Sequence, residues 1–542
     1  MRLTRERANQ LLSIKNLKVA FGVPGSGFAP KEVVHGLSFD LLPGQKLAVV
    51  GESGSGKTVS AQAILRLGMD AQYQGAIQYR NEDLLTVKES RIRQIRGKEI
   101  AMIFQEPMSA LNPLYSVGSQ VCEVLELHEG LTRAQARKKG IELFAQTRIP
   151  EPERRFDSLP HQLSGGQRQR AMIAMALACN PKILIADEPT TALDVTVQKQ
   201  IITLLDDLQR QVGLSVLLIT HDLPLVRAFA DYVVVMENGY LVEQGLTQDV
   251  FENPQQVYTQ KLIASRPQRL IPDGERVTGD TPLMQGKEVG CRFFFKTGWF
   301  SKRAFDAVKA ANISIPPGRT LGIVGESGSG KTTLGLTLLR LARGKMLGQV
   351  NFEGMRIDEM NESTLRPMRK NLQVVFQDPF NSLSPRMTVE QIVGEGLSVH
   401  EPNLSSGQRR TEILRVLGEV GLHEDALNRY PHEFSGGQRQ RIGIARALAL
   451  QPEFIICDES VSALDVSVQA QVLNLLNDLK SEFGFTYIFI SHDLSVVKFM
   501  SDRIMVMNSG RIEEMGDPEE IYHSPKSEYT RKLISSIPKI DN

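Results

Sequence analysis

The eight-residue segment GESGSGKT occurs twice in this chain, at residues 51–58 and 325–332. Both copies match the pattern G-x-x-x-x-G-K-[ST], in which a glycine-rich backbone turns its N–H groups toward phosphate oxygens. Each copy follows a short apolar run, Leu47–Val50 or Leu321–Val324, and precedes a stretch with few helix breakers. The sequence therefore predicts, twice, a buried strand followed by a phosphate-binding loop and a helix.

The residue types in this loop predict binding of a nucleotide with its metal ion. Lys57 and Lys331 can reach the β- and γ-phosphates, and Thr58 and Thr332 can place a hydroxyl on Mg²⁺. The predicted nucleotide-binding loops consist of Gly51, Glu52, Ser53, Gly54, Ser55, Gly56, Lys57 and Thr58, and of Gly325, Glu326, Ser327, Gly328, Ser329, Gly330, Lys331 and Thr332.

Composition limits the classes of protein that this chain can belong to. With 63 basic and 62 acidic residues the formal net charge is +1, which argues against a protein dominated by nucleic-acid binding. The four cysteines are far apart, so we expect neither a disulfide framework nor a metal knuckle. The charged N-terminus has no apolar signal region, and no run approaches eighteen apolar residues, so we expect no segment to cross a membrane.

The two halves of the chain repeat a longer series of motifs in the same order, roughly 270 residues apart. The first half contains FQEP at 104–107, PHQLSGGQRQR at 160–170, ILIADEPTTALDV at 183–195, ITHDL at 219–223 and VYTQKL at 257–262. The second half contains FQDP at 376–379, PHEFSGGQRQR at 431–441, FIICDESVSALDV at 454–466, ISHDL at 490–494 and EYTRKL at 528–533.

This repeat predicts two domains, at 11–265 and 288–538, joined by a Pro- and Gly-bearing linker at 266–287. Short apolar runs before the acidic and histidine motifs predict an alternating α/β core with a parallel sheet. Roughly 55 residues separate the FQ and SGGQ segments in each half. They include polar periodic stretches at 131–146 and 405–422, which predict an inserted helical subdomain.

In this order, the P-loop, FQ, SGGQ, DE, ALD and lone His motifs resemble the nucleotide-binding domain of ATP-binding-cassette (ABC) proteins. The resemblance covers essentially the whole chain, twice. It implies two tandem P-loop NTPase domains, each with a mostly parallel sheet core, an antiparallel β subdomain and an inserted helical subdomain. It also implies an ATPase whose cofactors are ATP and Mg²⁺.

The resemblance implies specific roles for residues outside the P-loops. Asp187 and Asp458 would hold Mg²⁺, and Glu188 and Glu459 would orient or deprotonate the attacking water. The implied metal-binding set is Thr58, Gln105, Asp187, Thr332, Gln377 and Asp458. The implied catalytic set is Glu188, Glu459, His221, His492, Gln105 and Gln377, in which the histidines contact the γ-phosphate and the glutamines touch metal or water.

The SGGQ segments resemble the signature motif, which in this family serves the ATP of the opposite domain. These segments are Ser164, Gly165, Gly166 and Gln167, and Ser435, Gly436, Gly437 and Gln438. Lys57 would thus share a nucleotide with Ser435, and Lys331 with Ser164. Phe21 and Phe293 stand about where the family stacks an aromatic ring on adenine, although Phe294 and Phe295 compete for that role.

Two departures from the family pattern occur, both in the second half. Phe434 replaces the usual Leu before SGGQ, and Ser460 replaces the usual Pro after the acidic pair. Neither removes a phosphate-contacting or acid–base group. We therefore expect both sites to hydrolyse ATP, with asymmetry between them.

Within the family, FQEPMSALNP, FQDPFNSLSP and the YT-x-K-L endings resemble the oligopeptide/dipeptide/nickel importer branch. A fused tandem of this length is similar to the Yej-type ATP-binding subunits of bacterial peptide and microcin C uptake. The resemblance implies two membrane-spanning permease subunits, a separate periplasmic or extracellular substrate-binding protein, and a peripheral position at the cytoplasmic face of the inner membrane. No iron–sulfur cluster is expected, because no cysteine follows Cys457.

Two alternatives differ in class or cargo. A soluble tandem ABC protein that acts on ribosomes also lacks membrane segments, but such proteins have a long, charged helical linker. A fused sugar-importer ATPase often carries one degenerate site, whereas this chain has two intact P-loops and two DE pairs.

Overall fold

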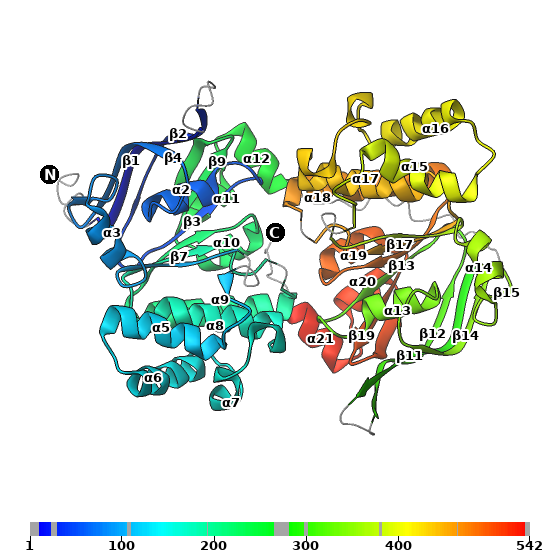
Figure 1. The fold of residues 1–542 in the computed structure, drawn as a ribbon, viewed down its shortest axis with the longest axis horizontal. Coiled ribbons are helices and arrows are strands. Elements are labelled where there is room, and N and C mark those ends of the chain that lie inside the picture. The colour runs from blue at the N-terminus through cyan, green and yellow to red at the C-terminus, as the bar shows by residue number, and fades with distance from the viewer. Residues whose placement is uncertain are drawn as a thin grey trace. The chain divides into compact units, whose positions relative to one another are not determined.

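The computed structural model describes residues 10–22, 30–105, 110–191, 193–264, 281–296, 302–378, 382–462 and 464–536. The chain forms two compact units, whose main parts are residues 1–193 with 197–265 and residues 266–537 (Figure 1). In the described residues, each unit contains a four-stranded sheet and a six-stranded sheet.

The six-stranded sheet is the core of the first unit. Its order is β10-β9-β3-β8-β7-β6, and all neighbours are parallel except the outermost β10, which runs antiparallel to β9. The central strands are short apolar runs buried on both faces, as expected of a parallel sheet covered by helices. The strands are β3 (Lys46–Val50), β6 (Ile100–Ile103), β7 (Ile183–Asp187), β8 (Ser215–Ile219), β9 (Tyr232–Glu237) and β10 (Tyr240–Leu246).

The four-stranded sheet of the first unit is antiparallel, in the order β2-β1-β4-β5. Its strands are β1 (Leu12–Phe21), β2 (Lys31–Leu41), β4 (Ala71–Tyr79) and β5 (Glu82–Asp83). The apolar residues Leu12, Ile14, Leu17 and Val19 of β1 are buried in the core cluster, whereas Lys15 and Asn16 are exposed.

A group of helices interrupts the first unit between β6 and β7. Ser116 and Thr132 cap the first two of these helices, because the side chain of each accepts a hydrogen bond from a backbone N–H in the first turn. The polar stretch at 131–146 forms the second helix, as its periodicity predicts. The helices are α5 (Val117–Glu129), α6 (Arg133–Gln146), α7 (Pro152–Phe156) and α8 (Gly165–Leu177).

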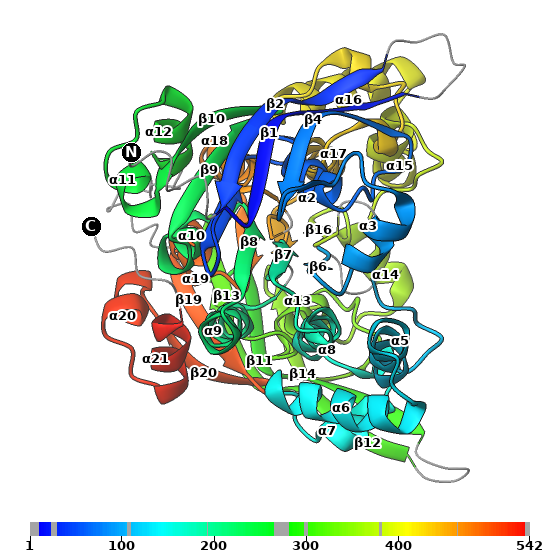
Figure 2. The same cartoon turned by 90° about the vertical axis from the view of Figure 1, so that its left-hand side faces the viewer.

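The alternation of side chains along each core strand supplies two separate hydrophobic clusters. In β3, Leu47 and Val49 belong to the cluster under the antiparallel sheet, whereas Ala48 and Val50 belong to the cluster under the inserted helices. Figures 1 and 2 show the antiparallel strands and α5–α7 on opposite sides of this unit. The other helices are α2 (Lys57–Ile64), α3 (Glu89–Ile95), α9 (Val195–Val212), α10 (Leu223–Phe229), α11 (Thr247–Glu252) and α12 (Val257–Ala264).

The second unit repeats this topology strand for strand. Its sheets have the orders β12-β11-β14-β15 and β16-β17-β18-β13-β19-β20. The strands are β11 (Met284–Lys296), β12 (Lys302–Ile315), β13 (Thr320–Val324), β14 (Lys345–Phe352), β15 (Met355–Arg356), β16 (Leu372–Val375), β17 (Phe454–Asp458), β18 (Thr486–Ile490), β19 (Arg503–Asn508) and β20 (Arg511–Gly516). The helices are α13 (Lys331–Leu338), α14 (Glu362–Met368), α15 (Val389–His400), α16 (Ser406–Glu419), α17 (Gly436–Leu448), α18 (Val466–Phe483), α19 (Leu494–Met500), α20 (Pro518–His523) and α21 (Glu528–Ser535).

These elements confirm the predicted fold class: tandem α/β units, each with a mostly parallel core sheet, an antiparallel sheet and a helical insertion. The first strand of the second unit begins at Met284, four residues before the predicted domain start at 288. Within the described part of the chain, none of the helices combines the length and the apolar character needed to span a bilayer.

Candidate active site

Both GESGSGKT segments form the loop between a core strand and a helix. The first lies between β3, which ends at Val50, and α2, which begins at Lys57. A Cβ on Gly51 would lie 2.1 Å from the carbonyl oxygen of Met236, and Gly51 has φ 152°. Gly325 in the second unit is equally constrained. A Cβ on it would lie 2.2 Å from the carbonyl oxygen of Met507, and Gly325 has φ 153°. Only glycine fits where the loop backbone meets the neighbouring strand.

The P-loop lysines are buried and directed into their own loops. Lys57 Nζ donates to the carbonyl oxygens of Gly51 at 2.8 Å and Glu52 at 2.7 Å. Lys331 makes the same two bonds at 2.9 and 3.0 Å. Burial lowers the pKa of Lys331, against the opposing effect of nearby carboxylates. A desolvated ammonium in a ring of backbone dipoles is well placed to bind an anion.

The P-loop threonines meet the acidic residues at the ends of neighbouring strands. Thr58 Oγ1 donates to Asp187 Oδ1 at 3.0 Å, and Thr332 Oγ1 donates to Asp458 Oδ1 at 2.7 Å. Burial, followed by the charge of Glu188, raises the pKa of Asp187 to about 6, although the bond from Thr58 opposes this. Burial also raises the pKa of Asp458.

Glu188 is held by three side chains in the first unit. Gln105 Nε2 donates to its Oε2 at 2.9 Å, Thr191 Oγ1 donates to the same oxygen at 2.8 Å, and His221 Nδ1 lies 3.2 Å from its Oε1. Burial alone would raise the pKa of Glu188, but the hydrogen bond and charge of His221 outweigh it and lower that pKa. For His221 the balance is the reverse: burial would lower its pKa, but Glu188 raises it.

Glu459 has a similar but not identical environment. Gln377 Nε2 donates to its Oε2 at 2.7 Å, and His492 Nδ1 lies 3.5 Å from the same oxygen. Ser462 donates to the backbone carbonyl of Glu459 at 2.9 Å, whereas the matching Thr191 donates to a carboxylate oxygen. Lys331 Nζ also approaches the Glu459 carboxylate, at 3.9 Å. The two units therefore hold the same carboxylate with different donors.

Both of these glutamates have left-handed backbone conformations. Glu188 has φ 46° and Glu459 has φ 44°, and their N–H groups bond to Ile219 O at 2.8 Å and Ile490 O at 2.9 Å. A glutamate with positive φ is uncommon and costs about 1 kcal/mol or more. Both units therefore keep this uncommon conformation at the matching residue.

The SGGQ segments begin the helices α8 and α17. Ser164 Oγ accepts from Gln167 N–H at 3.3 Å, and Gln167 Oε1 accepts from Ser164 N–H at 3.1 Å, which is a capping box. Ser435 and Gln438 form the same pair. The capping box uses the N–H groups of the serine and glutamine, so the two intervening glycines carry the first-turn N–H groups that an outside acceptor could reach.

The predicted adenine-stacking rings lie in the antiparallel sheets. Phe21 ends β1, and Phe293 lies in β11; both are partly buried against the cluster below their sheet. Phe294 and Phe295 are each 55% exposed. Nothing in these contacts decides which ring would contact a base, so the assignment stays a prediction.

The two departures in the second unit fit their surroundings differently. Phe434 is buried at the start of α17, and the guanidinium of Arg429 lies 4.3 Å from its ring centroid, which is a cation–π contact. The larger side chain is thereby covered within the helical insertion. Ser460 is also buried, and its hydroxyl lies near the Cys457 thiol, whose pKa burial raises to about 12.

The structure adds residues near the site that the motif order did not indicate. Thr191 bonds to Glu188, as described above. Tyr258 and Tyr529 bond to the P-loop backbone from the last helix of each unit. The repeated YT-x-K-L ending was visible in the sequence, but nothing local to it showed that its tyrosine lies beside the loop.

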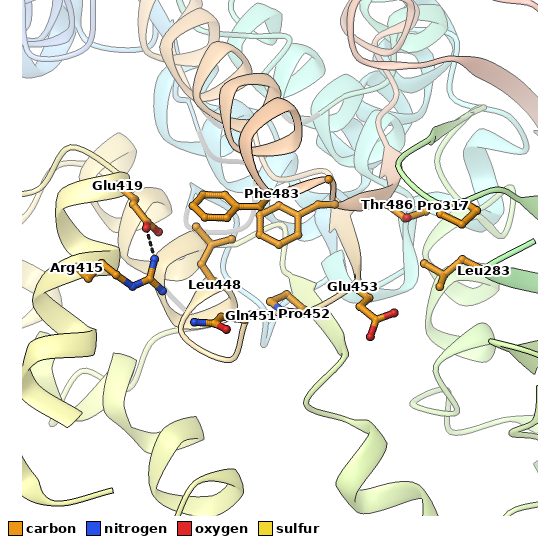
Figure 3. A pocket seen from close by; sticks show the side chains of 12 residues that line it. Leu283, Pro317, Arg415, Glu419, Leu448, Gln451, Pro452, Glu453, Phe483 and Thr486 are labelled. Carbon is orange, nitrogen blue, oxygen red and sulfur yellow. Dashed lines mark hydrogen bonds and ion pairs between the residues drawn. The ribbon is translucent and has the colours of Figure 1, made fainter. Parts of the chain in front are cut away.

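A pocket of about 420 Å³ in the second unit is separate from these residues (Figure 3). It lies where β17 and β18 begin, whereas the candidate site follows the carboxyl ends of the strands. Its lining consists of Leu283, Pro317, Arg415, Glu419, Leu448, Gln451, Pro452, Glu453, Phe483, Gly484, Phe485 and Thr486. Arg415 and Glu419 form an ion pair across one end of it. This pocket is therefore not the nucleotide site.

Comparison with known families matches this arrangement. The ABC transporter family model matches residues 34–191 and 308–462. The chain belongs to the ABC transporter family. It is an ATP-binding protein of that family and an ATPase. A second model, the oligopeptide/dipeptide transporter C-terminal region, matches residues 242–296 and 514–542, at the end of each half.

Curated relatives match nearly the whole chain. The peptidoglycan transport ATP-binding protein YejF of Agrobacterium fabrum is 50% identical, over 98% of this chain and 97% of its own length. The ABC transporter ATP-binding protein YejF of Escherichia coli is 45% identical, over 97% of this chain and 99% of its own length. The glutathione import ATP-binding protein GsiA of Salmonella paratyphi A is 43% identical, over 98% of this chain and 90% of its own length.

Proposed function

We propose that this chain powers the import of peptides or peptide-like compounds across the bacterial inner membrane. The observation that carries the proposal is the oligopeptide/dipeptide transporter region, which occurs at the end of both halves. Relatives named for peptidoglycan transport and glutathione import support it, since both names refer to compounds that contain peptide bonds.

Glu188 and Glu459 would be the catalytic carboxylates for ATP hydrolysis. Their lowered pKa values keep them ionised at neutral pH, so each can accept a proton from water or orient it. Gln105 and Gln377 hold one carboxylate oxygen in place. His221 and His492 face the carboxylates through Nδ1, which leaves Nε2 for the γ-phosphate.

The residues beside the P-loops fit Mg²⁺ by their chemistry. Thr58 with Asp187, and Thr332 with Asp458, present a hydroxyl and a carboxylate oxygen within 3.0 Å of each other. Mg²⁺ favours oxygen ligands and in such sites takes one or two carboxylates together with substrate phosphates. When bound, it would neutralise phosphate charge during transfer. Gln105 and Gln377 would complete the set of ligands.

Each complete ATP site would combine the P-loop of one half with the SGGQ segment of the other. Lys57 would share a nucleotide with Ser435, and Lys331 with Ser164. The glycine N–H groups at the starts of α8 and α17 suit phosphate oxygens at a helix N-terminus. Hydrolysis at both composite sites would let the halves separate, and the helical insertions would pass that motion to the permeases.

The partners of such a subunit would be two membrane-spanning permease subunits and a separate substrate-binding protein outside the membrane. The chain itself would be peripheral, on the cytoplasmic face of the inner membrane.

The catalytic assignment is tested with Glu188→Gln and Glu459→Gln, singly and together. The double variant should lose at least about a hundredfold in ATP turnover, the range for loss of an acid–base group, and should still bind ATP. Glu142→Gln, an exposed change on α6, is the matched control. Normal turnover in the double variant would refute the assignment.

The transport assignment is tested by affinity purification of the full chain from detergent-solubilised membranes. Two multi-spanning permeases should co-purify. Recovery on ribosomes, never with membranes, would instead support the ribosome-associated alternative and refute import.

A further inference from the structure

The last helix of each unit contacts the P-loop through one tyrosine. Tyr258 of α12 accepts a hydrogen bond from Glu52 N–H at 3.3 Å, and Tyr529 of α21 accepts one from Glu326 N–H at 3.1 Å. Glu52 and Glu326 are both the second residue of GESGSGKT. The same contact therefore occurs independently in the two units.

The peptide group that donates this bond also accepts a hydrogen bond from the P-loop lysine. The N–H of Glu52 points to Tyr258, and the carbonyl of the same peptide group, that of Gly51, accepts from Lys57 Nζ at 2.8 Å. In the second unit the matching carbonyl accepts from the lysine at 2.9 Å. A trans peptide is planar, so fixing its N–H also fixes the direction of its carbonyl. The tyrosine and the lysine thus bind opposite ends of one rigid group.

The helices that carry the tyrosines are anchored to the core sheet at their first turn. Glu243 of β10 accepts from Gln255 N–H at 2.9 Å and Gln256 N–H at 3.2 Å, just before α12. Glu514 of β20 accepts in the same way from Lys526 N–H at 2.8 Å and Ser527 N–H at 3.0 Å, just before α21. A carboxylate at a helix start is favourable because it meets the positive end of the helix dipole. The tyrosine hydroxyl is thereby presented to the loop from a fixed support.

We propose that Tyr258 and Tyr529 are positioning residues for ATP binding, which orient the first peptide group of each P-loop and through it the P-loop lysine. The proposal rests on the assignment of these loops to ATP. It gives the oligopeptide/dipeptide transporter C-terminal region, which includes both helices, a role in supporting the phosphate-binding loop of its own half.

A packing role alone would need the ring but not the hydroxyl. Burial raises the pKa of Tyr529 to about 12, so its hydroxyl stays neutral and accepts the bond at physiological pH. Replacement of tyrosine by phenylalanine keeps the ring and removes the hydroxyl that accepts this bond. The substitution therefore separates the two roles.

The experiment compares Tyr258→Phe, Tyr529→Phe and the double variant in the full chain. A typical net hydrogen bond corresponds to about a two- to tenfold change in affinity, so the double variant should raise KM for ATP by that factor, with kcat within about twofold. ATP binding measured with a fluorescent ATP analogue should weaken equally. Each single variant should weaken one class of site.

The matched control is Tyr522→Phe on α20, whose ring lies 4.4 Å from Lys498 Nζ. The first unit already has Phe251 at the corresponding position, so this change should be tolerated without an effect on KM.

An unchanged KM in all three tyrosine variants, with or without a lower melting temperature, would overturn the proposal. A wild-type protein that did not bind ATP would instead overturn the assignment of the P-loops. The two failures are therefore distinguishable.

Discussion

A buried ion pair in the second unit allows a sharp prediction about stability. Lys480 Nζ of α18 lies 2.8 Å from Asp502 Oδ2, and the two side chains are 14% and 13% exposed. Asp502 also accepts from Thr320 N–H at 2.7 Å and, through Oδ1, from the partly exposed Arg319 at 3.3 Å. In the first unit the matching Asp231 accepts from a backbone N–H at 2.9 Å, but Gln209 stands in place of the lysine.

Asp502→Asn should lower the free energy of unfolding of the second unit by about 2 kcal/mol. Removing one partner of a buried ion pair costs about 3–5 kcal/mol. The lower value follows because Lys480 Nζ also donates to Thr320 Oγ1 at 2.9 Å and so keeps one partner. Asp231→Asn should lower the free energy of unfolding by less than about 1 kcal/mol, because Gln209, and not a lysine, stands at the position that corresponds to Lys480.

This stabilisation should depend on pH in a definite direction. Burial alone would raise the pKa of Asp502, but the charge and hydrogen bond of Lys480 outweigh it and lower that pKa. A carboxyl with a lowered folded pKa contributes its stability above its unfolded pKa, about 3.9, and loses it as the pH falls through the folded value. The difference between wild type and Asp502→Asn should thus be constant near neutral pH and narrow below about pH 4.

Differential scanning calorimetry of the full chain measures both effects. For a unit of this size, 2 kcal/mol corresponds to about 4–8 °C in the transition of the second unit, and the transition of the first should not move. Equal shifts from Asp502→Asn and Asp231→Asn would refute the reasoning. So would a difference from wild type that widens as the pH falls.

Two further predictions concern glycines in helices. Gly443 in α17 is buried with nothing within 4 Å of an added Cβ, and the first unit has Met172 at the corresponding position. Gly443→Ala should therefore raise the free energy of unfolding, measured in urea, by about 0.5–1 kcal/mol. A lower free energy of unfolding would contradict this prediction. A Cβ on Gly118 in α5 would lie 2.1 Å from Phe156, so Gly118→Ala should cost about 1–3 kcal/mol, and an unchanged unfolding midpoint would contradict the packing described.

The helical insertion shows that a local sequence pattern can predict a helix and its approximate bounds. Polar periodic residues at 131–146 predict a helix, and α6 covers Arg133–Gln146 with a cap at Thr132. The strand before the P-loop is equally clear, because a short apolar run next to glycines is a local signal. The start of the first strand of the second unit, at Met284, is less clear from the sequence, because it lies inside the Pro- and Gly-bearing segment 266–287 that the composition predicts as a linker.

The sequence alone predicts which residues form the candidate site, because glycines in the loops, acids after apolar runs and the order of the motifs are all local properties that occur twice. Only the tertiary structure decided which groups hold those residues. Tyr258 lies 206 positions from Glu52, and Gln105 lies 83 positions from Glu188. The two P-loops are identical in sequence, yet Thr191 donates to the carboxylate of Glu188, whereas the matching Ser462 donates to the backbone carbonyl of Glu459. Contacts of this kind depend on how distant segments pack, and no single segment encodes them.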